Sequence, residues 1–267
     1  MRILHVTEAS WAGTLEVVQS LAAQQAAAGH DVVLAYADQP RTPRTLADTA
    51  GVELVPLRWA RRSPASQLAT GRALRRLVRE RRTELVHLHS SFAGAIGALA
   101  LPRGVPLIYT PHGFAFARSG AGRVTTAAVR VADALVARRC ALVGAVSEAE
   151  ARLARDGLRA PRVATVRNGI PELDDGVTER PLERGAPAVV AAGRILEQRR
   201  PAATARILSQ LAPVARVAWI GGGDSDHAAR PLHEAGIPIT SPGVSTHSPA
   251  CMTMFASAIT QKSSELR

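Results

Sequence analysis

Aromatic residues, cysteines and long apolar runs are all scarce in this chain of 267 residues. Aromatic residues make up 3 % of it and do not alternate with basic residues, so the stacking platforms of single-stranded nucleic-acid binders are missing and no nucleic-acid partner is expected. Two cysteines, Cys140 and Cys251, are too few for a disulfide framework, and no Cys/His spacing is typical of zinc ligands, so no metal site is predicted. The longest nearly uncharged apolar run, residues 92–101, is about half of the roughly 20 residues that span a bilayer. Residues 2–7 resemble a strand rather than a secretory signal, which predicts a cytoplasmic protein.

Basic charge is concentrated in the first part of the chain. Residues 1–170 contain 23 arginines and 12 acidic residues, a formal charge of +11, whereas residues 171–267 contain ten basic and ten acidic residues. The densest segment runs from Arg58 to Arg82, with nine arginines and one acid, Glu80. Such a field attracts anionic lipid headgroups, phosphorylated ligands or nucleic acid without distinguishing among them. Because Lys262 is the only lysine, the arginine content indicates the codon bias of a GC-rich genome more than a specific use of guanidinium groups.

Short apolar runs alternate with helical stretches through residues 1–170, which we interpret as one complete domain. The runs are nearly continuous rather than alternating, as in strands that are covered on both faces. This alternation predicts an α/β fold with a parallel, Rossmann-like sheet. The expected strands are residues 3–7, 31–36, 52–56, 85–89, 106–110, 142–146 and 163–166, and the expected helices are residues 13–28, 67–82, 93–101, 123–139 and 147–155.

The second part of the chain predicts a linker, a partial domain and an atypical tail. Residues 171–186 are rich in glycine, proline and acids, as in a linker. Residues 187–242 predict three strands, at 188–192, 215–220 and 237–240, which are too few for a complete Rossmann-like domain. Residues 243–267 contain no arginine before Arg267 and show no regular period, which fits either an ordinary loop and helix or a truncated or frame-shifted end. We favour the truncated end.

Two candidate sites lie after strands of the first domain. Gly13 opens a helix after the first strand, where a turn of small residues lets backbone N–H groups approach a ligand. His112 follows the strand at residues 106–110, and His87 and His89 end the preceding strand. The carboxyl edge of a parallel sheet is where ligands bind, so these histidines are expected to line a cleft. The alternative is that they are structural histidines with satisfied hydrogen bonds.

Two more candidate sites follow strands of the partial domain. Arg194 comes directly after the strand at residues 188–192, and Arg199 lies close behind it, so the two guanidinium groups could hold a diphosphate. Gly221 and Gly222 follow the next strand, where glycines permit close approach of a ligand or simply a tight turn. Solvated surface arginines are the alternative for the first pair.

Eight short strings follow one another in the chain: Ala-Gly (12–13), Gly-His-Asp-Val (29–32), Val-His-Leu-His-Ser (86–90), Thr-Pro-His-Gly (110–113), Val-Ser-Glu (146–148), Arg-Asn-Gly-Ile (167–170), Gly-Arg-Ile (193–195) and Trp-Ile-Gly-Gly-Gly (219–223). In this order they resemble the family-4 (group 1) glycosyltransferases of the GT-B fold over residues 1–240. A His-Ser-Ser-x-Ala-Gly string from His89 and a Pro-His-Gly string from Pro111 narrow the resemblance to variants that build exopolysaccharide or cell-wall glycans.

This resemblance implies a retaining enzyme that moves a sugar from a UDP- or GDP-linked donor to a glycan or lipid-linked acceptor, without metal or cofactor. The first domain would hold the acceptor and the second most of the donor. His112 would be the catalytic residue, hydrogen-bonded to the donor sugar. The remaining implied contacts are to donor and phosphate from Gly13, Arg194, Arg199, Gly221 and Gly222, and on the acceptor side of the cleft from His89, Ser90 and Asn168.

The chain departs from the family pattern at three places. Ala12 replaces the first glycine of the usual pair, and Arg199 stands where the family has a lysine. The family's two glutamates, eight positions apart, have no counterpart, because Glu265 is the only acid after Gly243. The alternatives are therefore a non-catalytic remnant or binding protein of the same fold, and a sugar-nucleotide 2-epimerase.

The helix expected at residues 67–82 has an amphipathic pattern. Leu74, Leu77 and Val78 fall on one side and arginines on another, as in helices that lie on anionic bilayers. This pattern predicts peripheral attachment to the inner membrane face through the segment from Arg58 to Arg82. A crossover helix with a solvated polar face is the alternative.

Overall fold

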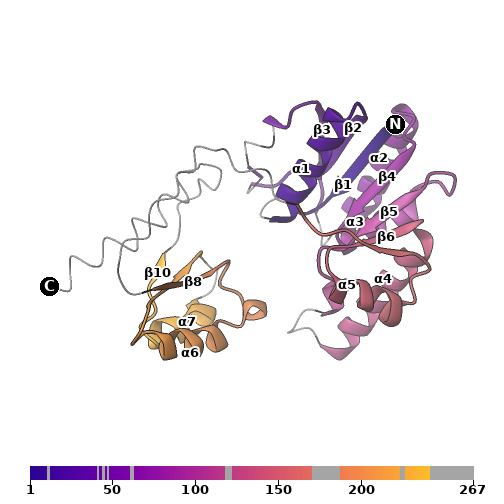
Figure 1. Ribbon diagram of the computed structural model, residues 1–267. Helices are drawn as coiled ribbons and strands as arrows, with labels where there is room; N and C mark the ends of the chain where they lie inside the picture. The colour runs from indigo at the N-terminus through magenta and orange to yellow at the C-terminus, as the bar shows by residue number, and fades with distance from the viewer. Residues whose placement is uncertain are drawn as a thin grey trace. The chain divides into compact units, whose positions relative to one another are not determined.

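The computed structural model describes residues 1–10, 13–40, 42–43, 46, 48–60, 63–117, 122–169, 187–222 and 226–240. The chain forms two compact units, Met1–Pro171 and Glu172–Arg267, and each is described by itself (Figure 1). The expected linker at residues 171–186 and the expected tail at residues 243–267 lie outside the described residues.

Seven parallel strands form the sheet of the first unit, in the order β3-β2-β1-β4-β5-β6-β7. Each strand lies where the apolar runs predicted one, and together with the second, smaller sheet they confirm the α/β fold class. The strands are β1 Arg2–Thr7, β2 Asp31–Ala37, β3 Val52–Leu57, β4 Leu85–His89, β5 Leu107–Thr110, β6 Leu142–Ala145 and β7 Val163–Thr165.

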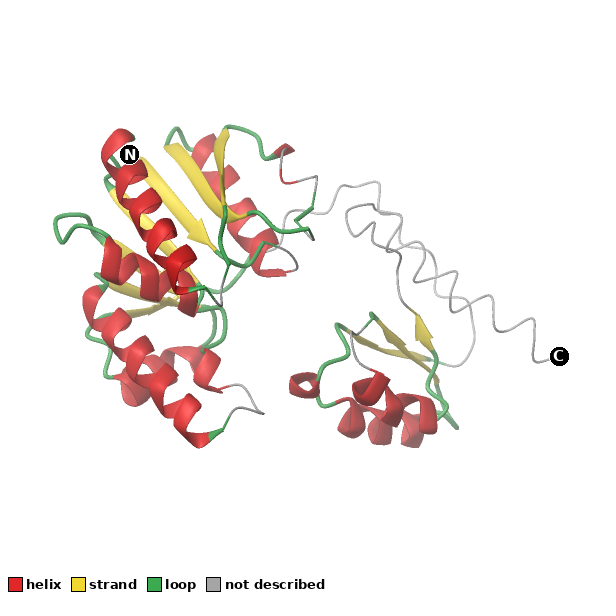
Figure 2. Cartoon of the chain, turned by 180° about the vertical axis from the view of Figure 1, so that it is seen from behind, coloured by secondary structure: helices red, strands yellow, loops and turns green. Residues whose placement is uncertain are grey.

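Helices cover both faces of this sheet, which explains why the strand sequences are nearly continuous apolar runs (Figure 2). On one face, Leu74, Ile96 and Val136 from three helices pack in one core with strand residues such as Leu88. On the other face, α1 packs against Leu34 of β2. The helices are α1 Gly13–Ala27, α2 Pro64–Glu80, α3 Ser91–Ala100, α4 Arg123–Arg139 and α5 Glu148–Arg152, with short helical turns η2 Ala115–Ala117 and η3 Leu153–Gly157.

Helix α2 begins one turn earlier than the sequence pattern predicted. The side chain of Ser63 accepts a hydrogen bond from the Ser66 N–H, and Pro64 occupies the first turn, where its missing N–H has no cost. The apolar side of the helix, with Leu74, Leu77 and Val78, is buried in the core of the unit. The crossover interpretation therefore accounts for its amphipathic pattern.

Two glycines let α3 lie close to the sheet. A Cβ atom on Gly97 would stand 2.5 Å from Leu88 Cδ2, and one on Gly94 would stand 2.8 Å from the ring of Tyr109. Any larger side chain at these positions would move the helix or repack the strand residues beneath it. This close packing fixes the helix that begins directly after His89 and Ser90.

Within residues 187–222 and 226–240, the second unit has a smaller sheet of three parallel strands in the order β10-β9-β8. Its two longer helices lie on the same face of the sheet, where Leu208 and Leu232 pack with Trp219 (Figure 1). This arrangement is a partial Rossmann-like domain, as predicted. Its elements are β8 Ala188–Ala192, the short turn η4 Glu197–Arg199, α6 Pro201–Leu211, β9 Arg216–Ile220, α7 Asp226–Glu234 and β10 Ile239–Thr240.

Candidate functional site

The carboxyl ends of β1, β4 and β5 meet at the point where the strand order of the first unit reverses. Strand β1 pairs with β2 on one side and with β4 on the other. In open α/β sheets this reversal leaves a crevice outside the strand ends, which is where ligands bind. The register pairs His5 with His87 and Thr110 with His89, so these four side chains lie on one face of the sheet.

Four histidines gather at this place. The Nδ1 atom of His5 lies 3.0 Å from Nε2 of His89, and Nδ1 of His89 lies 3.0 Å from Nε2 of His112. His87 lies beside them, with its Nε2 atom 2.8 Å from the hydroxyl of Thr110. His112, which the sequence placed in the cleft, is therefore hydrogen-bonded to the buried His89 and is linked through it to the buried His5.

These imidazoles are neutral near pH 7. Burial lowers the pKa of His5 to about 4, against a smaller raising effect of its hydrogen bond with Gln25. Burial also lowers the pKa of His112 to about 4. For His87 and His89, burial first and the neighbouring histidines second hold the pKa well below its usual range. A neutral imidazole has one N–H donor and one bare nitrogen that accepts.

Ser90 and His112 both adopt left-handed backbone conformations, with φ of 84° and 51°. Residues with side chains rarely occupy this region, and those that do cluster at functional sites. Ser90 caps α3, since its side chain accepts from the Ala93 N–H, and its hydroxyl also donates to the buried carboxylate of Glu8. The family resemblance implied an acceptor-side position for Ser90, whereas no sequence pattern pointed to Glu8.

The buried carboxylate of Glu150 holds the turn that carries His112. One oxygen accepts from the Gly113 N–H at 2.6 Å and the other from the Val146 N–H at 2.7 Å. The Ser-x-x-Glu pattern is typical of a capping box, and Ser147 does accept from the Glu150 N–H. The second bond of a capping box, donated by the Ser147 N–H to the Glu150 side chain, is replaced by these two, so the carboxylate joins α5 to the end of β5. The capping pattern was thus the signal that could have drawn attention to Glu150.

The predicted donor-side residues belong to the second unit, apart from Gly13. A Cβ atom on Gly221 would lie 2.2 Å from the carbonyl oxygen of Gly193, so the close approach of two strand ends is enough to require this glycine. The carbonyl of Gly222 accepts from the Ile195 N–H. The guanidinium of Arg199 lies against Gly193, at 3.4 Å from the position of its Cβ. The tight-turn alternative for the glycines thus has direct support.

Two predicted residues of the first unit lie outside the histidine cluster. Gly13 opens α1, and among the described residues no atom beyond its chain neighbours and its own helix backbone lies within 4 Å of the position its Cβ would take, so there is space beside its backbone on that side. Asn168 is exposed after β7. His89, Ser90 and His112 are the predicted residues that the structure brings together. Gln25, His5, Glu8 and Glu150 complete their surroundings and were missed.

His5, His87 and His89 are also close enough to share a metal ion, because each offers a ring nitrogen within 4.8 Å of the other two. Imidazole nitrogens suit zinc, copper, iron or nickel. However, His5 and His89 already use both ring nitrogens in hydrogen bonds with other side chains. A metal ion would have to displace some of these bonds.

The sequence model of a family described as "Glycosyl transferase 4-like domain" matches residues 12–169, more than half of the chain. The chain belongs to this glycosyl transferase 4-like family. The family match confirms the resemblance found in the eight sequence strings. No curated protein matches the chain.

Solved structures of the GT-B fold are similar to this chain. Sucrose-phosphate synthase from Thermosynechococcus elongatus has a TM-score of 0.72 and 16 % identity, covering 91 % of this chain and 70 % of that one. Anabaena HepE, solved in complex with UDP and glucose, has a TM-score of 0.67 and 17 % identity with the same two coverages. UDP-N-acetylglucosamine 2-epimerase from Rickettsia bellii has a TM-score of 0.53 and 12 % identity, and the match covers 91 % of this chain and 69 % of the epimerase. At these identities the likeness shows the fold alone.

Within the described part of the chain, none of the helices combines the length and the apolar character needed to cross a lipid bilayer.

Proposed function

We propose that this chain is a retaining glycosyltransferase that moves a sugar from a UDP- or GDP-linked donor to a glycan or lipid-linked acceptor. The observation that carries the proposal is the position of His112. It stands, incompletely buried, in strained backbone at the carboxyl edge where the strand order reverses, within a family of transferases. The UDP and glucose in the Anabaena HepE structure support the donor class.

The chemistry explains the residue types. When the bond between sugar and diphosphate breaks, negative charge grows on the leaving diphosphate while the sugar becomes oxocarbenium-like, so N–H donors aimed at the phosphates lower the barrier. In this proposal the open backbone at Gly13 and the guanidinium groups of Arg194 and Arg199 serve the diphosphate. His112 contacts the donor sugar, and the turns at Ser90 and Asn168 serve the acceptor. No step requires a metal or a cofactor.

Calorimetry with UDP, GDP and their sugar conjugates tests the proposal. We expect binding of one nucleotide that Arg194→Ala weakens about tenfold or more, since charge-assisted hydrogen bonds contribute about 1.5–3 kcal/mol. Arg206→Ala, an exposed position on α6, is the matched control and should leave the affinity unchanged. If neither nucleotide nor any conjugate binds, the donor site does not exist and the proposal is wrong.

The reaction products distinguish the proposed transferase from two other candidate functions. The similarity to a 2-epimerase of the same fold keeps epimerisation as the second candidate. An epimerase converts the nucleotide sugar into its epimer without any acceptor. A transferase releases free nucleoside diphosphate when it moves the sugar to an acceptor. A chain that binds the nucleotide but does neither is the non-catalytic form of the fold. NMR of the donor after incubation, with and without lipid-linked acceptor, distinguishes the three.

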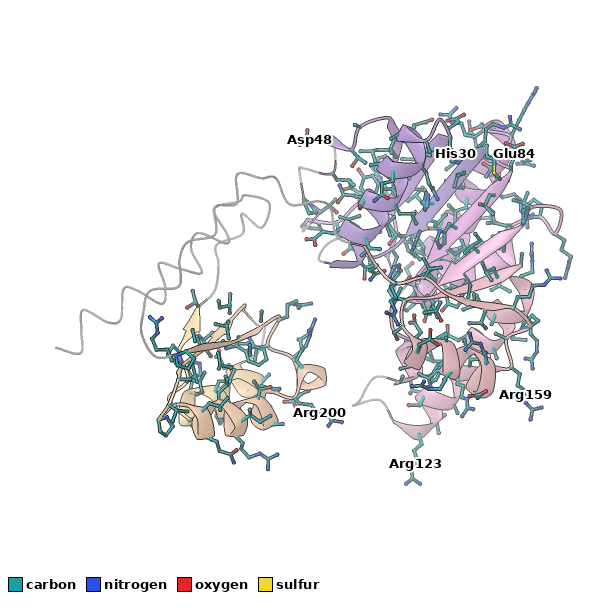
Figure 3. All side chains as sticks on the ribbon, in the orientation of Figure 1. His30, Asp48, Glu84, Arg123, Arg159 and Arg200 are labelled. Carbon is teal, nitrogen blue, oxygen red and sulfur yellow. The ribbon has the colours of Figure 1, made fainter. Side chains whose placement is uncertain are left out.

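Contact with an anionic membrane surface is part of the same proposal. Because the apolar side of α2 is buried in the core, such contact would use the exposed arginines of that helix, among them Arg72 and Arg79. Arginines also extend from other parts of the surface of this unit, for example Arg123 and Arg159 (Figure 3). Purely electrostatic binding weakens with salt. We therefore expect sedimentation with anionic but not neutral vesicles at low salt, and release at high salt.

A further inference from the structure

Four side chains form one continuous line of hydrogen bonds through the first unit. The side-chain oxygen of Gln25, on α1, lies 2.7 Å from Nε2 of His5. The line continues from Nδ1 of His5 to Nε2 of His89 at 3.0 Å, and from Nδ1 of His89 to Nε2 of His112 at 3.0 Å. It begins on a helix, crosses two neighbouring strands and ends at the left-handed residue of the candidate site.

Once the donor in the hydrogen bond between Gln25 and His5 is known, the donor in each following hydrogen bond of the line is known too. An amide oxygen only accepts, so Nε2 of His5 carries the proton and its Nδ1 is bare. Nε2 of His89 must then donate to that bare nitrogen, which leaves Nδ1 of His89 bare. Nε2 of His112 donates in turn to His89. The Nδ1 atom of His112 is therefore the bare nitrogen at the end of the line, and within the described part of the chain it has no hydrogen-bond partner.

This direction of the line, together with a bare Nδ1 on His112, requires all three imidazoles to be neutral. A protonated ring donates from both nitrogens. A proton on Nδ1 of His89 would therefore face the N–H group at Nε2 of His112, and two donors cannot form a hydrogen bond with each other. Burial opposes such a charge, because His5 and His89 are both fully enclosed in the unit. The lowered pKa values of all three rings agree with the neutral form.

We propose that Gln25, His5 and His89 are positioning residues that hold His112 in the Nε2–H tautomer, so that its Nδ1 atom accepts a hydrogen bond from a hydroxyl group of the bound sugar. The role in sugar binding rests on the proposed function, whereas the tautomer itself does not. A histidine with a single fixed tautomer presents an acceptor at all times and needs no rearrangement when the ligand arrives.

Proton-detected nitrogen spectra of the histidine rings test the tautomers directly in the wild-type protein at pH 7.5. We expect His5, His89 and His112 all to carry the proton on Nε2. Protons on Nδ1 of all three rings would mean that the NH2 group of Gln25, and not its oxygen, faces Nε2 of His5. This result would overturn the proposal. Stoichiometric zinc in the purified protein, bound by His5, His87 and His89, would overturn it too.

Variants of Gln25 separate positioning from simple packing. Gln25→Leu removes the acceptor, so His112 becomes a mixture of tautomers. If the competent form falls to about a third, the apparent affinity for the nucleotide sugar falls about threefold. Gln25→Glu keeps an acceptor and should restore the single tautomer and the affinity. Gln24→Leu, at an exposed neighbour on the same helix, is the matched control and should change neither.

The outcomes distinguish this inference from the proposed function. Reversed tautomers in a protein that binds nucleotide sugars would refute the tautomer assignment alone. The expected tautomers in a protein that binds no nucleotide sugar would refute the proposed function together with the role in sugar binding. An unchanged tautomer in Gln25→Leu would refute the positioning role.

Discussion

Replacing Glu150 should loosen the turn of His112 without disturbing the rest of the fold. The carboxylate is buried and accepts from two backbone N–H groups, those of Gly113 and Val146, at 2.6 and 2.7 Å. Hydrogen bonds to a charged group contribute about 1.5–3 kcal/mol each. Glu150→Ala removes both, so we expect a loss of roughly 3–6 kcal/mol, toward the lower end if water enters. Glu150→Gln keeps one acceptor and should lose about half as much.

Two measurements check this prediction. Urea unfolding of the first unit gives the loss of free energy, and hydrogen exchange at the amides of Gly113 and Val146 shows whether the loss is local. Glu148→Ala is the matched control, because this exposed carboxylate in the first turn of the same helix contributes about 0.3–1 kcal/mol. Unchanged exchange at Gly113 in Glu150→Ala would show that the carboxylate does not hold the turn, and the reasoning would be refuted.

Three further predictions concern protonation and packing. Because burial lowers the pKa of His5 to about 4, the unfolded chain binds a proton below pH 6.5 that the native chain excludes. Stability is therefore lost as pH falls from 6.5 to about 4, by roughly 3 kcal/mol for His5 alone, and equal urea midpoints at pH 7.5 and 4 would contradict this. Gly221→Ala places a Cβ 2.2 Å from the Gly193 carbonyl and should cost the second unit about 3 kcal/mol, against about 1 kcal/mol for Gly236→Ala, which has open space. Gly97→Ala presses on Leu88 and should cost about 1–3 kcal/mol in thermal unfolding, whereas Gly104→Ala, also in open space, should stay within about 0.5 kcal/mol.

The fold was predictable because a doubly covered parallel sheet has a strong sequence pattern. Strands such as β2 and β4 are short apolar runs bounded by helices, and this pattern survives whatever the exact packing is. The ends of helices were less predictable. The beginning of α2 at Pro64 depends on Ser63 as a cap, a local signal that was present in the sequence but was outweighed by the hydrophobic period further along.

Positions in the candidate site were predictable only where a residue ends a strand or follows it closely. His89, Ser90 and His112 were found for this reason, since the end of a parallel strand is the expected position of a ligand contact. His5 lies in the middle of β1, and Gln25 lies on a helix 20 residues later, so only the register of β1 with β4 and the packing of α1 bring them to the cluster. Contacts of this kind depend on tertiary structure and leave no spacing in the sequence.

The two strained residues of the site have a common support. Left-handed backbone at Ser90 and His112 costs of order 1–3 kcal/mol each, and it persists only where the surroundings hold it. In both turns a buried carboxylate is the partner: Glu8 accepts from the Ser90 hydroxyl, and Glu150 accepts from the Gly113 N–H next to His112. These bonds are formed within the protein itself, so the turns are set before any ligand binds. A site whose geometry is fixed in advance loses less free energy on binding, and this is why we expect substitution of the buried carboxylates to weaken ligand binding even though neither is proposed to touch the sugar.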